Sequence, residues 1–184
     1  MNKPSLHDIP KFPYWHFSCD VSWRHLEDWI EKETATARLE LVPDFQRGHV
    51  WTDAQASRFI EFKLRGGRSG GDLLLNCPGF TTRGNMNGPY VMVDGLQRVT
   101  AVRRFLRDEI PAFGRLLSEY RDRPDRTIYS FHWCVAELET RAEVLRWYLD
   151  LNAGGTPHAA TEIERVRALL AAAEGSEAPH VDAG

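Results

Sequence analysis

Residues 90–100, Tyr-Val-Met-Val-Asp-Gly-Leu-Gln-Arg-Val-Thr, place a short apolar run directly before an Asp-Gly turn and a helical pattern. Apolar side chains continue at helical spacing as far as Ile110, so we expect a buried strand over 90–93 that passes through Gly95 into a helix. Glycine lets the backbone approach a ligand closely, and the first N–H groups of a helix lack intrahelical partners. The junction therefore has the features of an anion site.

Two side chains add chemistry to this junction. Arg98 carries a planar guanidinium that suits phosphate, and Asp94 can hold a magnesium ion or orient a nucleophile. The alternative is that Asp94-Gly95 forms an ordinary turn and Arg98 is a surface residue. The generic pattern, taken alone, favours that plainer interpretation.

Upstream, a loop over residues 43–51 contains one acid, one amide, one guanidinium and one indole: Asp44, Gln46, Arg47 and Trp51. A capping box over 52–55 then predicts a helix as far as Leu64, whose start is a second end able to face a phosphate. Trp51 can stack on a base or anchor the loop. For a single Trp, packing is the more common role.

Downstream, residues 128–138 are expected to form a strand, and a capping box over 140–143 opens a helix through about Leu151. Residues 152–157, Asn-Ala-Gly-Gly-Thr-Pro, then predict a glycine turn before a last helix over 161–175. Paired glycines can expose N–H groups as an anion nest. A helix C-cap is the alternative, and it is favoured for this turn on its own.

The remaining pattern predicts a helix from Ser22 to about Glu33, a short strand over 38–42 and a strand over 72–77. Because the strands are short and few, we expect a compact α+β fold with a short mixed sheet flanked by helices. We also expect three regions along the chain. They are a Pro- and aromatic-rich N-terminal arm over 1–18, a single domain over 19–175 and a disordered tail over 176–184.

Composition excludes several classes of protein. With 42% hydrophobic residues, six Trp and nine Phe, the chain is too apolar to be mainly disordered. It has neither an apolar run of about 18 residues, as a transmembrane helix requires, nor an N-terminal signal-peptide core. Three cysteines without Cys-x-x-Cys spacing indicate reduced thiols in a cytosolic protein. A net charge of −3 argues against a strongly basic nucleic-acid binder, although residues 58–68 and 98–126 are locally basic.

Three of these segments occur in the order of a known family pattern: Gln46-Arg47…Trp51, then Asp94-Gly95-Leu96-Gln97-Arg98-Val99-Thr100, then Asn152-Ala153-Gly154-Gly155-Thr156-Pro157-His158. The set resembles the N-terminal domain of GmrSD-type modification-dependent restriction proteins, within the ParB/sulfiredoxin-like superfamily. The resemblance covers about residues 38–165.

The resemblance implies a ParB/sulfiredoxin-like domain with a nucleotide pocket where the three motifs meet, and it implies Mg²⁺ and a nucleoside triphosphate (ATP or GTP) as cofactors. The implied catalytic residues are Asp94, Gln97 and Arg98. The implied nucleotide- and phosphate-binding residues are Gln46, Arg47, Gly95, Thr100, Asn152, Gly154, Gly155 and Thr156. Trp51 is the candidate for base stacking, and Asp44 and Asp94 are the candidate metal ligands.

One departure from the family pattern is Leu96, which replaces a Gln and removes a polar contact from the turn. The leading hypothesis is a nucleotide-binding domain with Mg²⁺-dependent NTP hydrolysis or phosphoryl transfer, linked to DNA modification or restriction. The alternatives are a non-catalytic nucleotide- or DNA-binding module, or decoy for restriction systems, and a metal-dependent DNA nickase. The expected partner is a nucleotide, with DNA as a second candidate and no membrane. Small size suits a phage-encoded protein that acts in the host cytoplasm.

Overall fold

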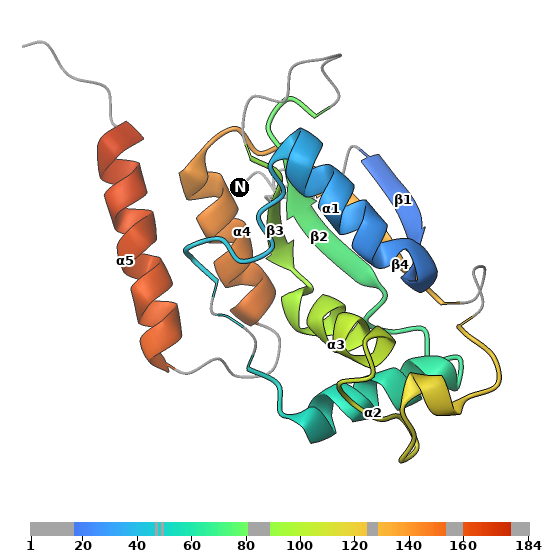
Figure 1. Cartoon of the computed structure of the whole chain (residues 1–184). Coiled ribbons are helices and arrows are strands. Elements are labelled where there is room, and N and C mark those ends of the chain that lie inside the picture. The colour runs from blue at the N-terminus through green and yellow to red at the C-terminus, as the bar shows by residue number, and fades with distance from the viewer. Residues whose placement is uncertain are drawn as a thin grey trace, which may run out of the picture.

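The computed structural model describes residues 17–46, 48, 50–80, 89–124, 129–153 and 160–177 (Figure 1). In these residues the strands are β1 (Phe17–Ser22), β2 (Asp72–Asn76), β3 (Val91–Asp94) and β4 (Ser130–Ala136). The helices are α1 (Leu26–Ala37), α2 (Asp53–Leu64), α3 (Leu96–Leu106), α4 (Arg141–Ala153) and α5 (Ala160–Glu177). Two short 3-10 turns, η2 (Trp23–His25) and η3 (Leu117–Glu119), complete the set.

The four strands form one mixed sheet in the order β1-β4-β2-β3. The edge strand β1 runs antiparallel to β4, with Asp20 opposite His132, and β4 runs parallel to β2. The pairing of β2 with β3 is antiparallel and is interrupted between Leu74 and Leu75. This arrangement confirms the predicted α+β class with a short mixed sheet flanked by helices.

Two apolar clusters hold the helices to the sheet. The larger one joins α1, α2 and α3 to one sheet face through Leu26, Ile30, Ile60, Leu73, Val99, Val102, Phe131 and Trp133. The smaller one joins α4 and α5 to the other face through Val93, Ala136, Leu145, Trp147 and Val166. Met92 and Val93 belong to different clusters, as the alternation of side chains along a strand requires. Figure 1 shows α1 across the front of the sheet and α5 packed outside α4.

The amino-terminal part of the described chain differs from the sequence-based prediction. Residues 17–22 form β1, although the prediction placed them in the arm and at a helix start. Helix α1 begins only at Leu26, after η2, and it continues to Ala37, beyond the expected end at Glu33. The remainder of the predicted arm, residues 1–16, lies outside the described residues.

Three smaller boundaries also differ. The strand predicted over 38–42 is a single β-bridge between Glu40 and Val91, because Arg38 ends α1 in the left-handed region with a φ of 52°. Helix α3 ends at Leu106, before Ile110. Helix α5 extends to Glu177, past the expected end near 175, and the remainder of the predicted tail lies outside the described residues.

Candidate functional site

The junction between β3 and α3 has the geometry that the sequence predicts. Gly95 separates Asp94, the last residue of β3, from Leu96, the first residue of α3, and it has a φ of +120°. A Cβ on Gly95 would overlap the buried side chain of Leu73, so only glycine fits this turn without strain. Gly95 has no side chain to cap α3, and no side chain of the described residues takes its place, so the first N–H groups keep their capacity to donate to a ligand.

Arg98 lies over this uncapped helix start. Its Nη2 atom is 2.7 Å from Asp94 Oδ2, and the Arg98 side chain is only 20% exposed, whereas that of Asp94 is 50% exposed. The Nε atom of Arg98 is buried and has no hydrogen-bond partner in the described part of the chain. An unpartnered buried donor costs about 1–3 kcal/mol, so an incoming anion that accepts from Nε would remove a penalty.

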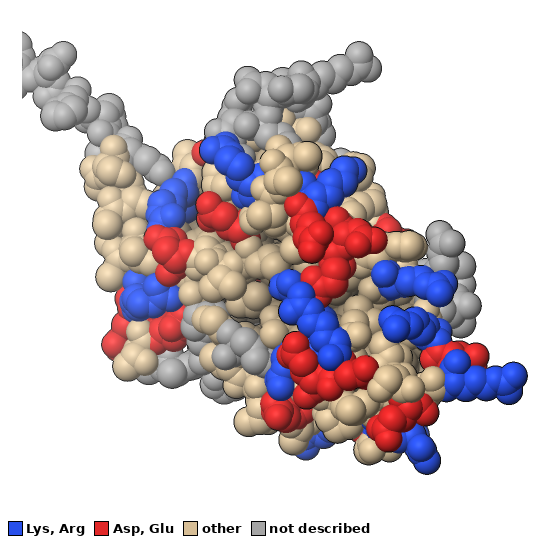
Figure 2. Space-filling model, viewed as in Figure 1, with Lys and Arg blue, Asp and Glu red and all other residues tan. Residues whose placement is uncertain are grey.

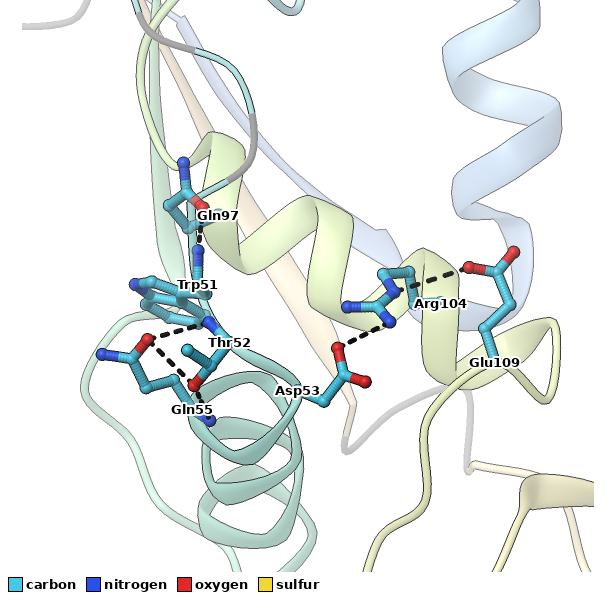
Figure 3. Close-up of polar contacts among 7 residues, drawn as sticks. All are labelled: Trp51, Thr52, Asp53, Gln55, Gln97, Arg104 and Glu109. Atoms are coloured by element: carbon cyan, nitrogen blue, oxygen red, sulfur yellow. Dashed lines mark hydrogen bonds and ion pairs between the residues drawn. The ribbon is translucent and has the colours of Figure 1, made fainter.

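Two glutamine amides fasten the upstream loop to this junction. Gln46 donates from Nε2 to the Met92 carbonyl oxygen at 2.6 Å. Gln97 accepts from the backbone N–H groups of Val50 (2.9 Å) and Trp51 (3.2 Å), and its Nε2 donates to the Gly48 carbonyl oxygen at 3.1 Å. The contact of Gln97 with the Trp51 segment is drawn in Figure 3.

The two glutamines therefore position the loop beside α3. A catalytic role for Gln97 and a ligand contact for Gln46 stay predictions. Arg47, from the same motif, lies outside the described residues.

The capping box at the start of α2 is confirmed. Gln55 N donates to Thr52 Oγ1 at 3.3 Å, and Thr52 N donates to Gln55 Oε1 at 2.9 Å (Figure 3). Trp51, just before it, is half-buried and packs on Phe59 with ring centroids 5.5 Å apart. This contact agrees with the packing role that was favoured for Trp51, and base stacking by Trp51 stays a prediction.

Asp44, a candidate metal ligand, is engaged by arginine. Both of its carboxylate oxygens accept from Arg141 Nη2, at 2.8 and 2.7 Å, and its backbone carbonyl accepts from Arg165. These contacts tie the loop to α4 and α5. The described residues hold no group of three or more His, Cys, Asp or Glu side chains placed for a metal ion. Metal binding by Asp44 and Asp94 stays a prediction.

The third motif is placed only at its first residues. Asn152, expected in a turn, lies in the last turn of α4, where its Nδ2 donates to the Tyr148 carbonyl oxygen at 2.6 Å. Gly154, Gly155 and Thr156 lie outside the described residues. Thr100, from the second motif, lies on α3 two residues beyond Arg98 and is half-buried.

Sequence reasoning placed Lys63, at the end of α2, only in the locally basic segment 58–68, and it missed the pair Gly70-Gly71 just before β2. A Cβ on Gly70 would lie 3.4 Å from Arg98 Cδ, and one on Gly71 would lie 3.5 Å from Lys63 Nζ. Both cationic side chains therefore pack over this glycine pair. The four glycines within residues 66–71 were the available signal.

Arginines in α3 and just after it are paired with acids, and Figure 2 shows blue and red side chains interspersed on the face that it presents. Arg103 and Arg107 both contact Glu27, at 2.9 and 3.0 Å. Arg104 contacts Asp53 at 2.9 Å and Glu109 at 3.5 Å (Figure 3). Arg103, Arg104 and Arg107 of the locally basic segment are therefore neutralised by neighbouring acids.

These features define a small α+β domain with an uncapped helix start beside an arginine. The chain matches the family described as GmrSD restriction endonuclease, N-terminal domain, over residues 26–132. Since this match covers more than half of the chain, the chain belongs to that family, which confirms the resemblance stated from the sequence. The match includes the first two motifs and stops before the third. Comparison with curated proteins and with solved structures gave no significant match. No helix in the described part of the chain is long and apolar enough to cross a membrane.

Proposed function

We propose that this chain is a nucleotide-binding domain of a modification-dependent restriction system, and that it uses Mg²⁺ to hydrolyse a nucleoside triphosphate or to transfer its phosphoryl group. The observation that carries the proposal is the buried, unpartnered Nε of Arg98 beside the uncapped start of α3. The link to restriction rests on membership of the GmrSD N-terminal family.

Phosphoryl transfer depends mostly on positioning and on neutralising charge, which these groups supply. Asp94 holds the Arg98 guanidinium in place, and the first N–H groups of α3 add a fixed positive end. The half-exposed Asp94 is the single carboxylate in the turn itself. This donor set fits Mg²⁺ only as an ion carried mainly by phosphate oxygens and water, which is how proteins commonly bind it. When bound, Mg²⁺ would neutralise charge on the phosphates.

Phosphate release tests the proposal. It is measured for the four NTPs with Mg²⁺, with and without DNA, on wild type, Arg98→Ala and the control Arg146→Ala. Arg146 forms a more exposed ion pair, with Glu174 at 2.6 Å, far along the chain from the turn. We expect turnover in wild type and in Arg146→Ala, and its loss in Arg98→Ala while the melting curve is preserved. Equal turnover in Arg98→Ala would refute the phosphate site.

A second candidate is a binding module without turnover. Leu96, where the family has a polar Gln, is 6% exposed and packs in the core, so the turn lacks one polar side chain. This candidate predicts that nucleotide binds in equilibrium dialysis, that Arg98→Ala weakens the binding, and that no phosphate is released. Steady release that tracks the intact protein would exclude it.

A further inference from the structure

The connection from α2 to β2 is a glycine-rich loop, Gly66-Gly67-Arg68-Ser69-Gly70-Gly71. Gly66 and Gly70 have positive φ angles, of 84° and 70°, so these two positions require glycine. Gly71 has no positive φ, and a Cβ there would make only ordinary contacts, at 3.5 Å to Lys63 Nζ and 3.6 Å to the Arg68 carbonyl oxygen. The absence of a side chain at Gly71 is therefore not imposed by its backbone conformation.

Two cations from different helices converge on this loop. Arg98 comes from α3 and packs over Gly70, with Nη1 4.0 Å from a Cβ built there. Lys63 comes from α2, and its Nζ lies over Gly71. A side chain at position 70 or 71 would contact these cations, so the two glycines keep side-chain atoms away from them on this side.

Lys63 forms no close ion pair with the described residues, and the nearest acid that acts on it is Asp72. Lys63 is half-buried, and no carboxylate of the described residues lies within 4.0 Å of its Nζ. Burial is the main cause that lowers the pKa of Lys63; Asp72 opposes the shift and the positive charge of Arg98 adds to it. A partly desolvated cation beside a second cation is stabilised by an anion that contacts both.

The charge balance indicates more than one phosphate. At the start of α3, Asp94 offsets the charge of Arg98, which leaves mainly the helix end, equivalent to about half an elementary charge. Lys63, over Gly71, supplies a further positive charge that Asp72 partly offsets. A single phosphate bound at the turn would leave Lys63 unpaired, whereas a chain of phosphates reaches both places.

We propose that Lys63, Arg98 and the Gly70-Gly71 backbone form a subsite for the outer phosphates of a nucleoside triphosphate. The inference rests on the proposed function, since it places the first phosphate at the start of α3. The loop and Lys63 then set the preference for a triphosphate over a monophosphate.

Isothermal titration of the full chain tests this subsite with a nucleoside mono-, di- and triphosphate of the same base and with inorganic tripolyphosphate. The variants are Lys63→Ala, which removes the cation, and Gly71→Ala, which keeps both cations and adds a methyl group 3.5 Å from Lys63 Nζ. Lys32→Ala is the control, because it removes the same charge from an exposed position on α1. Circular dichroism melting confirms that each variant folds.

We expect Lys63→Ala to raise the Kd for the triphosphate and for tripolyphosphate about tenfold, the loss of one charge-assisted contact, and the Kd for the monophosphate less than about twofold. Gly71→Ala shifts affinity in the same direction, and Lys32→Ala leaves it unchanged. The inference would be overturned if Lys63→Ala bound all three nucleotides as tightly as wild type while Arg98→Ala lost nucleotide binding. That result would leave the proposed function intact.

Two other outcomes separate the remaining possibilities. If wild type binds tripolyphosphate but no nucleotide, the proposed function fails and this inference fails with it, because the subsite would not serve a nucleoside triphosphate. If Lys63→Ala weakens binding of a DNA duplex and leaves tripolyphosphate binding unchanged, Lys63 contacts a DNA backbone and the inference is overturned.

Discussion

Replacing Gly95 by alanine tests the turn on which the candidate site depends. A non-glycine residue at a φ of +120° is in a sparsely populated region, which costs about 1–3 kcal/mol. The new Cβ would also overlap Leu73, which is fully buried and has no free space to enter, and forced repacking of this kind costs about 1–3 kcal/mol. The two effects sum to about 2–6 kcal/mol, which in a chain of this size lowers Tm by about 5–20 °C.

The assay is thermal unfolding followed by circular dichroism, with Gly175→Ala as the control. Gly175 lies in α5 with no heavy atom within 4 Å of a Cβ built there, so alanine should keep or raise Tm through its better helix propensity. A fall below about 2 °C for Gly95→Ala would refute the reasoning, since it is smaller than the shift expected from about 1 kcal/mol.

A double-mutant cycle identifies the cause of the cost at Gly95. Leu73→Ala alone creates a cavity and is expected to destabilise by about 2–5 kcal/mol. With Gly95→Ala, the new methyl group occupies part of that cavity, so the double variant should be at least about 1 kcal/mol more stable than the sum of the single effects. Additive losses would show that close packing against Leu73 is not the cause.

Three further predictions concern the rest of the fold. Asn76→Ala should lower the urea midpoint by an amount equivalent to about 2–5 kcal/mol. The reason is that the buried Asn76 amide accepts from the Leu138 N–H (2.7 Å) and donates to the Leu138 carbonyl oxygen (3.0 Å). An unchanged midpoint would contradict this. Burial raises the pKa of Cys77 and of Cys134 to about 11, so both thiols should resist alkylation by iodoacetamide at pH 8. The free energy of unfolding should also fall from about pH 9 towards pH 11, because the unfolded chain loses these thiol protons at lower pH than the folded chain. Alkylation of either thiol as fast as a free peptide thiol would show that it is not shielded. A fragment restricted to residues 26–132 should show no cooperative melting, since it lacks β1 and ends within β4; a sharp transition would show that the sheet does not need them.

Local patterns predicted the features that depend on neighbours in sequence. The capping box of Thr52 and Gln55 and the strand–Gly95–helix junction each depend on fewer than about a dozen consecutive residues, and both are confirmed. Strand β1 was missed because Val21 is its single fully buried residue, which leaves no alternation to detect. Its structure depends on pairing with β4, far along the chain.

In the candidate site, too, some features follow from neighbouring residues in the sequence and others depend on tertiary packing. The sequence predicted the junction that holds Asp94 and Arg98, but it did not predict the ion pair between them. The sequence also gave no sign that Gln97 holds Gly48, Val50 and Trp51, because that loop must first fold back onto α3. Lys63 meets the same site only through the packing of α2 beside α3, which no local pattern encodes.

The pairing of β1 with β4 has a consequence for how the chain acquires its fold during synthesis. The contact between Asp20 and His132 spans 112 positions in the sequence, and β4 is the strand that joins β1 to β2. During synthesis on the ribosome, β1 cannot pair until β4 has been made, whereas the segments of α1, α2 and α3 are complete earlier. Folding that depends on contacts between residues far apart in the sequence is slow, and the apolar strands stay exposed for longer as a result. We therefore expect nascent chains to depend on chaperones until residue 136 has left the ribosome.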